Sequence, residues 1–303
     1  MRFLARRLIH GLLVVCVVIT LAFFLVRLTG DPVGLIAGTE ATEEQIATIT
    51  QALHLDKPLW LQYAIYMRDV LGGDFGRSFF TPDSALRMVL QTVPASILLT
   101  GAAIGLAVMI GLPVGILAGA RPGSLADWFA RALSVFGQCT PAFWLGIVLI
   151  LLFSVKLRWL PYGGIGGWEH LVLPAATLAA LTVPIVAQVA RSSVMDTLRQ
   201  DYIRTARSKG LSEFRIVLTH ALANASLPII TVIGLRLGAI VGGAVVTETV
   251  FSYPGLGRLA VHAAINRDFP VLQAFLVAVS AAIVVINLAI DWLYAVFDPR
   301  IRS

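Results

Sequence analysis

Three ionisable side chains within or near long apolar runs are the residues of this sequence best placed to do chemistry. They are Arg236, Glu248 and Asp291, all in the last quarter of the 303-residue chain. A charge at the centre of a membrane helix costs about 2.5 to 3.5 kcal/mol on insertion scales, so such residues tend to be functional. Provided that the apolar runs are membrane spans, these three residues are the candidates to line a polar path through them. The alternative for Arg236 is a side chain that snorkels to the interface, and for Glu248 and Asp291 a solvated helix end.

The sequence has no motif for catalysis, nucleotide binding or metal binding. It contains no G-x-x-x-x-G-K-[ST] loop, no H-E-x-x-H pair and no G-x-S-x-G elbow. Its five histidines are scattered along the chain, so we expect no metal site from this chain alone, no catalytic residue and no cofactor of its own. The histidines are His10, His54, His170, His220 and His262.

The composition predicts an integral membrane protein. Hydrophobic residues make up 58% of the chain and charged residues 13%, where soluble domains have about 25% charged residues, and the mean hydropathy is +0.86. Six continuous apolar runs are long enough for transmembrane α-helices and lack the alternation of a β-barrel strand. We predict an all-α polytopic membrane protein with one transmembrane domain over residues 1–303. The runs are residues 9–28, 95–118, 132–155, 171–190, 229–250 and 271–296.

Lysine and arginine are distributed unevenly about these runs. Thirteen flank one side of the predicted membrane and four the short loops of the other. The positive-inside rule then places both termini and the loop 191–227 in the cytoplasm, and the insertion 29–94 outside. The net charge of +6 is explained by this topology and by attraction to anionic lipid, and it does not imply nucleic acid.

The insertion 29–94 has helical signals of its own. "TEEQ" at residues 42–45 fits a capping box, and "PLWLQYAIYMRDVL" at 58–71 keeps apolar residues at helical spacing until "GGDFG" ends it. The second segment is rich in Trp60, Tyr63, Tyr66 and Met67. It could lie on the membrane surface or on a partner, or it could cap the outer ends of the helices.

The loop 191–227 is expected to form two short helices joined at Gly210, which can take the positive φ that ends the first helix. Ser212 is a candidate N-cap for the second. Pro228 should then stand in the first turn of the fifth span. The second helix has one predicted apolar face, made of Phe214, Val217, Leu218, Ala221 and Leu222.

Small residues mark a packing face on the predicted fifth span. Gly234, Gly238 and Gly242 recur every four residues, so another helix backbone can approach there. Arg236 is displaced from this stripe by about 200° around the helix, and it should therefore face a polar cavity or lipid.

Several segments together resemble the B-type permease subunit of the dipeptide, oligopeptide and nickel branch of binding-protein-dependent ABC importers. A Glu-Ala-Ala-like triplet followed by a glycine is typical of such permeases. Here the triplet departs from that pattern and reads Arg204-Thr205-Ala206, followed by Gly210. The whole segment, "RTARSKG", is similar to the form usual in this branch. The resemblance covers the whole chain. Its other motifs are "LGGDFGRS", "TETVFSYPGLGR", "NRDFPVLQ" and "NLAIDWLYAVFDPRIR".

The resemblance implies a subunit of the type I ABC importer permease fold in the bacterial inner membrane. It would pair with a homologous C-type permease as a heterodimer, together with two cytoplasmic ATPases that bind ATP and Mg²⁺ and an external substrate-binding protein. The helix after Gly210 would be the coupling helix that docks in an ATPase. The coupling residues would be Arg204, Thr205, Ala206, Gly210, Glu213, Phe214 and Arg215.

The expected cargo is a di- or oligopeptide, and the alternative is nickel, a metal chelate or an opine-type solute. The stretch "LPYGGIGGWEHLVLP" at residues 160–174 is similar to an outer loop of nickel permeases. Two other classes of protein fit less well. A secondary transporter or channel should show inverted repeats or polar residues in several spans. An intramembrane enzyme needs a nucleophile and a base at usable spacing, and neither is found.

Overall fold

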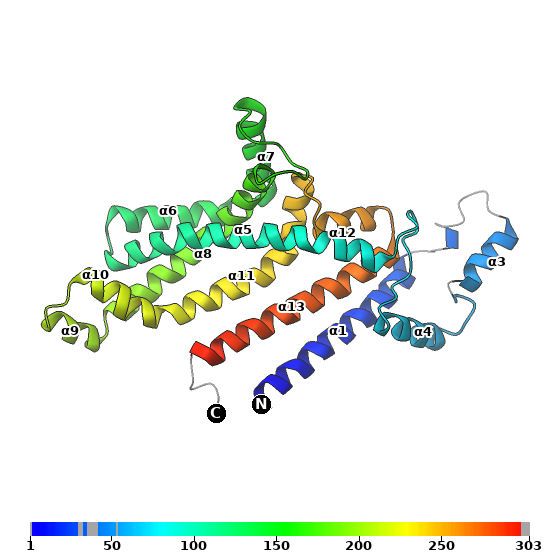
Figure 1. Cartoon of the computed structure of the whole chain (residues 1–303), viewed down its shortest axis with the longest axis horizontal. Coiled ribbons are helices and arrows are strands. Elements are labelled where there is room, and N and C mark those ends of the chain that lie inside the picture. The colour runs from blue at the N-terminus through cyan, green and yellow to red at the C-terminus, as the bar shows by residue number, and fades with distance from the viewer. Residues whose placement is uncertain (1, 30–32, 35–41, 53, 298–303) are drawn as a thin grey trace. The chain divides into compact units, whose positions relative to one another are not determined.

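The computed structural model describes residues 2–29, 33–34, 42–52 and 54–297, and its regular structure is helical (Figure 1). Within these ranges there is no β-strand, so the prediction of an all-α protein is confirmed. Parts of the predicted insertion 29–94, and the predicted position of the C-terminus at Ser303, lie outside the described residues.

Five helices are long and apolar enough to cross a membrane. Each contains one of the predicted apolar runs and extends beyond it, because the polar residues at the ends of a run continue the same helix. These helices are α1 (Arg2–Thr29), α5 (Ala85–Ala120), α8 (Glu169–Leu198), α11 (Leu222–Val250) and α13 (Phe269–Phe297).

The predicted span over residues 132–155 does not form one continuous helix. The chain instead forms α6 (Leu125–Cys139) and a second segment, α7 (Ala142–Leu149) continued by the π-helix η1 (Ile150–Lys156), bent by 102° from α6. The break lies at Thr140 and Pro141. A residue before proline is disfavoured in the helical region, and Thr140 is extended at φ −92° and ψ 118°. Counted as one broken span, the pair gives the predicted six.

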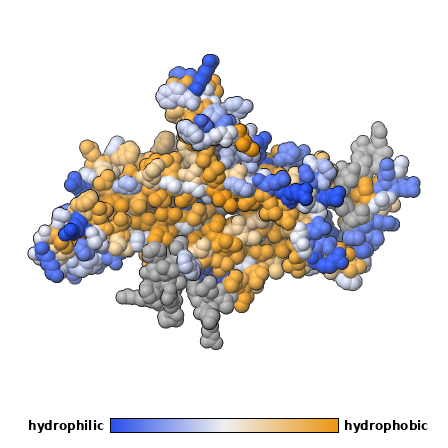
Figure 2. Space-filling view, viewed as in Figure 1, coloured by the Kyte–Doolittle hydropathy of each residue, from blue (hydrophilic) through white to orange (hydrophobic). Residues whose placement is uncertain are grey.

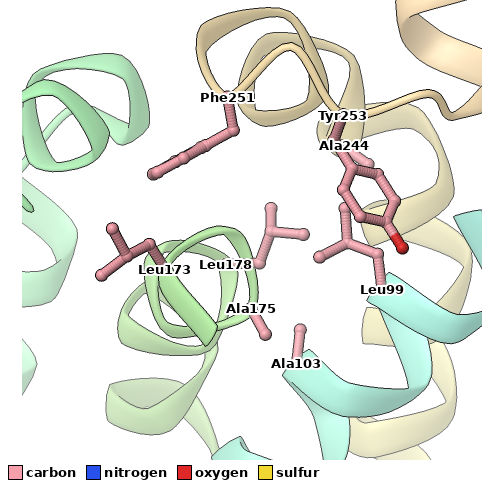
Figure 3. Packing of buried hydrophobic residues seen from close by; sticks show 8 residues of the cluster. All are labelled: Leu99, Ala103, Leu173, Ala175, Leu178, Ala244, Phe251 and Tyr253. Carbon is pink, nitrogen blue, oxygen red and sulfur yellow. The ribbon is translucent and has the colours of Figure 1, made fainter. Parts of the chain in front are cut away.

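The chain divides into two compact units, each described here by itself. Unit 1 comprises Met1–Pro94 and Arg258–Val284, and unit 2 comprises Ala95–Gly257 and Val285–Ser303. In unit 2, α8 packs against α11 and α6. Buried side chains from α5, α8, α11 and the turn after α11 meet in its apolar core (Figure 3). The core residues are Leu99, Ala103, Leu173, Ala175, Leu178, Ala244, Phe251 and Tyr253.

Glycines bring the backbones of α5 and α8 into close contact. A Cβ atom on Gly111 would lie 2.8 Å from the carbonyl oxygen of Val183, and a Cβ on Gly115 or Gly119 would come even closer to a carbonyl of α8. These three glycines recur every four residues along one face of α5, as small residues do where membrane helices pack. We call this contact the α5–α8 seam. The similar stripe on α11 was predicted from the sequence, whereas this one was not.

The predicted stripe on α11 is confirmed in part. A Cβ on Gly234 would lie 2.8 Å from Ile290 of α13, so the helices pack closely there. A Cβ on Gly238 would meet no atom within 4 Å, so that position is open. The side-chain environment of Gly242 is outside what the structure describes. Pro228 lies inside α11 instead of in its first turn, because the helix begins at Leu222.

In unit 1, α4 (Leu59–Leu71) packs against the last turns of α1. The ring of Phe23 lies 5.2 Å from that of Tyr63 and 5.3 Å from that of Tyr66, centroid to centroid, and Tyr63 shares a 2.8 Å hydrogen bond with Thr20. Tyr63 and Tyr66 therefore cover part of α1. For this helix, the contacts support the expectation that the segment caps the helix ends. Trp60 is exposed.

The predicted capping box at the start of α3 (Glu43–Ala52) is confirmed. The backbone N–H of Thr42 donates to Gln45 Oε1 at 3.0 Å, and the N–H of Gln45 donates to Thr42 Oγ1 at 3.3 Å. The glycines after α4 end that helix as predicted, because Gly73 and Gly76 have φ of +80° and +81°.

Two of the motifs behind the family resemblance meet in unit 1. Ser78 of "LGGDFGRS" donates a hydrogen bond to the buried carboxylate of Asp268 in "NRDFPVLQ", and the N–H of Phe79 donates to the same carboxylate at 3.3 Å. The rings of Phe79 and Phe269 pack edge to face. Asp268 lies in the turn between α12 (Leu256–Ile265) and α13. These contacts therefore fix the loop before α5 to the start of α13.

Candidate functional site

The loop between α8 and α11 forms a compact hydrophilic tip of unit 2. Figure 2 shows hydrophilic residues over α9 and α10 and hydrophobic ones along the long helices of the same unit. The tip contains α9 (Asp201–Ser208), a glycine turn, the three-residue helix α10 (Glu213–Arg215) and the π-helix η2 (Ile216–Ala221), which runs on into α11. We call residues 199–221 the α9 tip.

Gly210 forms the turn of the α9 tip in the predicted left-handed conformation, at φ +79°. Its N–H donates to Arg207 O at 2.9 Å, and the N–H of Leu211 donates to Ala206 O at 3.3 Å, which satisfies carbonyls at the end of α9. Ser212 occupies the predicted N-cap position of α10 but makes no capping side-chain bond. Gly210 therefore redirects the chain, as predicted.

The prediction that a second short helix follows Gly210 as a separate element is wrong, because η2 continues into α11 without a break. The π-helix also widens the turn, and this changes which residues face inward. Of the five residues of the predicted apolar face, Ala221 is buried while Phe214 and Leu218 are exposed, so the face divides between core and surface. Ile216, which was not predicted to belong to it, is buried.

A small apolar core fixes α9 against the rest of the tip. Ile203 and Ile216 are fully buried and Ala206 nearly so, and Leu198 and Leu211 pack beside them. Ala206 of the predicted triplet thus faces inward, while Arg204 and Thr205 are exposed. Only Ala206 of the triplet packs in the core, and the other two residues face solvent.

An ion pair bridges the glycine turn. Arg207 Nε lies 2.6 Å from Glu213 Oε1, and Arg207 Nη2 lies 3.1 Å from Glu213 Oε2, in a bidentate arrangement. The Glu213 carboxylate raises the pKa of Arg207 further above its ordinary value, mainly through this hydrogen bond. Both side chains are substantially exposed, so the pair contributes at most about 1 kcal/mol. Glu213 was predicted as a contact residue, whereas its partner Arg207 was not.

Phe214 is the most exposed large apolar side chain of the α9 tip, at 76%. It follows Glu213 directly, so it projects from a segment whose backbone is fixed by the ion pair and by buried Ile216. An exposed phenylalanine on an otherwise hydrophilic, well-packed tip is typical of an anchor for another protein. Arg215 is exposed beside it.

Glu248 lies at the C-terminal end of α11 and is completely buried. Its Oε1 accepts the Ser96 hydroxyl at 2.6 Å, and its Oε2 accepts the Gly257 N–H at 2.6 Å. A Cβ on Gly255 would overlap this carboxylate, so the turn can close over it only with glycine there. Burial and the nearby Glu248 charge raise the pKa of Tyr253, whose hydroxyl donates to Ala95 O at 3.3 Å.

The other two deep ionisable residues lie in different environments. Arg236 is half-buried in the middle of α11, and Asp291 is buried near the end of α13. Arg236 and Glu248 are twelve residues apart on α11, more than three helical turns, so these two predicted path residues do not meet. No group of three potential metal ligands occurs among the described side chains. His170 Nδ1 lies 2.9 Å from the Gly163 carbonyl oxygen.

An ion cluster around the buried carboxylate of Asp127, which was not predicted from the sequence, ties α6 to α8. The carboxylate of Asp127 pairs with Arg191 Nε, lies 3.0 Å from Arg131 Nη2 and accepts the Gly123 N–H at 2.9 Å. The N–H of Asp127 also donates to Ser124 Oγ at 3.3 Å, the N-cap of α6. The signal available in the sequence was the serine three residues before an acidic residue, which is typical of a helix start.

The chain belongs to a family of binding-protein-dependent transport proteins. The family described as "Binding-protein-dependent transport system inner membrane component" matches residues 111–303, and its N-terminal counterpart, "Binding-prot-dependent transport system membrane comp, N-term", matches residues 1–100. The protein is therefore a multi-pass inner-membrane permease subunit of an ABC importer, a membrane component without an ATP site of its own. Such membership implies a partner permease, an ATPase and a binding protein in general.

Similar proteins cover the whole chain. A probable peptide ABC transporter permease protein, y4tP, of Sinorhizobium fredii is 40% identical, with 99% of each chain covered. The glutathione transport system permease protein GsiC is 42% identical in Salmonella typhimurium, covering 97% of this chain and 96% of its own, and 39% identical in Escherichia coli K12, covering 100% and 99%.

Solved structures confirm the fold. An inward-facing structure of the MetNI methionine ABC transporter matches with a TM-score of 0.59 at 21% identity, over 70% of this chain and 96% of that one. An amino acid ABC transporter matches with a TM-score of 0.52 at 16% identity, over 71% and 94%. The predicted type I ABC importer permease fold is therefore confirmed.

Proposed function

We propose that this subunit forms half of the translocation path for short peptides in an ABC importer. It would pair with a homologous C-type permease, receive cargo from an external substrate-binding protein and be driven by two cytoplasmic ATPases. The support for a peptide cargo is that relatives about 40% identical over the whole chain carry the names of peptide and glutathione transport systems, glutathione being itself a short peptide.

The α9 tip is the element we assign to ATPase docking. The observation that carries this assignment is Phe214, exposed on a packed tip beside the Arg207–Glu213 ion pair. Phe214 would insert into a cleft of the ATPase, with Arg204 and Arg215 at the polar rim, and the packed core under α9 would transmit the movement to α8 and α11. A rigid tip suits this role because a flexible one would absorb the movement.

The cargo can be tested with the reconstituted complex and its cognate binding protein. Di- and tripeptides should stimulate ATP hydrolysis several-fold over the binding protein without cargo, and nickel or a nickel chelate should give no stimulation. The measurement is phosphate release from proteoliposomes at saturating binding protein. Stimulation by nickel but by none of a panel of peptides would show that the metal alternative is correct.

We also propose that both termini and the α9 tip are cytoplasmic, on the strength of the lysine and arginine asymmetry. In a variant lacking Cys16 and Cys139, a membrane-impermeant thiol reagent applied outside should label Ser84→Cys and leave Ser303→Cys unlabelled. Permeabilising the membrane should expose Ser303→Cys. Equal labelling of both positions in sealed cells would overturn this orientation.

A further inference from the structure

A polar groove runs between α6 and α8 in unit 2, where the two helices lie side by side (Figure 1). Its volume is about 500 Å³. The helices meet closely beside it, because a Cβ atom on Gly137 would overlap the ring of Pro184. Most of the side chains that line the groove are polar, and they are Arg131, Ser134 and Gln138 from α6 with Gln188 and Arg191 from α8.

The polar side chains of α6 form one stripe along the helix. Arg131, Ser134 and Gln138 are spaced i, i+3 and i+7, so they share a face. A different face carries the exposed apolar side chains Phe129 and Phe136, and Phe136 is displaced from Gln138 by about 200° around the helix. A membrane helix with one polar and one apolar exposed face borders two different media.

The two glutamines of the groove have side chains without a partner. Gln138 and Gln188 are exposed, and neither side-chain amide forms a hydrogen bond with any described residue. Both lie within apolar runs that were predicted to span the membrane, and Gln138 lies about 10 Å along α6 from Arg131. An amide exposed to hydrocarbon without a partner is costly, so polar side chains in spans normally face a bundle interior or a water-filled cavity.

The groove carries a net positive charge. Arg131 and Arg191 are the only charged side chains among the described residues that line it. Both pair with the single carboxylate of Asp127, which is itself only 2% exposed, so the cluster as a whole keeps one positive charge. A positive charge beside a narrow polar passage repels cations, and divalent cations most strongly.

We propose that this groove forms part of the wall of the aqueous translocation path. Gln138 and Gln188 offer hydrogen bonds to the passing solute, and the cluster around Asp127 disfavours a bare divalent cation. The proposal rests on the role of the subunit as half of a translocation path, but not on which solute is carried. It assigns to the path residues that were not predicted for it, whereas Glu248, which was, is completely buried.

The test compares the rates at which single cysteines react with a water-soluble methanethiosulfonate reagent. The protein is the assembled complex in lipid nanodiscs, in a background with Cys16→Ala and Cys139→Ala. Gln138→Cys should react at least about tenfold faster than the matched control Phe136→Cys, because the reactive thiolate forms in water and not in hydrocarbon. Both positions are exposed on the same helix, so the difference reports what each face borders. Gln188→Cys should react as fast as Gln138→Cys.

A second measurement separates a path from a fixed crevice. Trapping the complex with ATP, vanadate and the cognate binding protein should slow the reaction of Gln138→Cys several-fold, because a path with alternating access closes on one side.

A third measurement tests the charge of the groove. At Gln138→Cys the ratio of the rates with an anionic and a cationic reagent should exceed the ratio for a free thiol in solution, and Arg131→Gln should lower it. Arg121→Gln is the matched control, because Arg121 is exposed before α6 and does not line the groove, and it should leave the ratio unchanged.

Three results would contradict the proposal. Equal rates at Gln138→Cys and Phe136→Cys would show that lipid or protein covers the groove. A fast rate that vanadate trapping does not change would show a fixed crevice. An unchanged ratio in Arg131→Gln would show that the cluster does not set the charge of the path. None of these measurements needs a transported solute, so a failure of the peptide assignment would be recognised separately.

Discussion

Replacing Gly210 with valine should reduce binding-protein-stimulated ATP hydrolysis by roughly tenfold or more in the assembled complex. Gly210 has φ +79°, and holding a β-branched residue there costs about 1 to 3 kcal/mol. A Cβ at Gly210 would meet no atom within 4 Å, so this cost comes from the backbone alone and not from a clash. The chain would relax out of the turn and displace Phe214. Phosphate release with loaded binding protein measures the effect.

Gly210→Asn is the matched control, because asparagine adopts the left-handed conformation several-fold more readily than other non-glycine residues. It should retain most of the stimulation. Phe214→Ala should fail in the same assay and should release the ATPases during purification, since a buried anchor at an interface is commonly worth at least about 2 kcal/mol. Full stimulation in both Gly210→Val and Phe214→Ala would show that the α9 tip is not the coupling element.

Replacing Glu248 with leucine should destabilise the permease by about 2 to 5 kcal/mol, or about 1 to 3 kcal/mol for each donor left without its acceptor, out of the 5 to 15 kcal/mol typical of a folded protein. The substitution removes the acceptor of the Ser96 hydroxyl, which is half-buried, and of the Gly257 N–H, which is buried. Leucine has a similar volume, so the loss reports hydrogen bonding more than packing. The thermal midpoint and the amount of folded protein in detergent measure the effect.

Glu248→Gln should be milder, because its amide oxygen can still accept from Gly257 and its amide nitrogen can donate to Ser96 Oγ. The exposed Glu44, on α3, provides a second comparison, and Glu44→Leu should leave the midpoint unchanged. If Glu248→Leu were fully stable but inactive in transport, the carboxylate would act in the translocation path instead of in the fold.

Much of the fold could be predicted from the sequence, because hydrophobicity over 20 or more residues is a strong signal. The apolar runs, the capping box at Thr42 and the left-handed Gly210 follow from local rules that no tertiary contact overrides here. The break at Pro141 was not predicted, although the proline is visible in the sequence. Mean hydropathy over a long window stays high on both sides of a break and therefore does not reveal it.

The candidate site was less predictable, because its residues are placed by contacts distant in sequence. Glu248 was predicted as a path candidate, but its hydrogen bond from Ser96, 152 residues earlier in the chain, could not be predicted from the sequence. The role of Asp127 depends on Arg191, 64 residues away. The apolar face after Gly210 was divided by a π-helix, whose extra residue per turn has no clear sequence signature.

The α5–α8 seam restricts how unit 2 can deform during a transport cycle. At Gly111, Gly115 and Gly119 the two backbones are so close that one helix can advance along the other only by whole four-residue steps, each about 6 Å long. Smaller displacements would drive carbonyl oxygens into the neighbouring helix. The two helices should therefore move as one body. Spectroscopic labels placed along them would keep constant separations and give an internal reference against which the motion of every other helix can be measured.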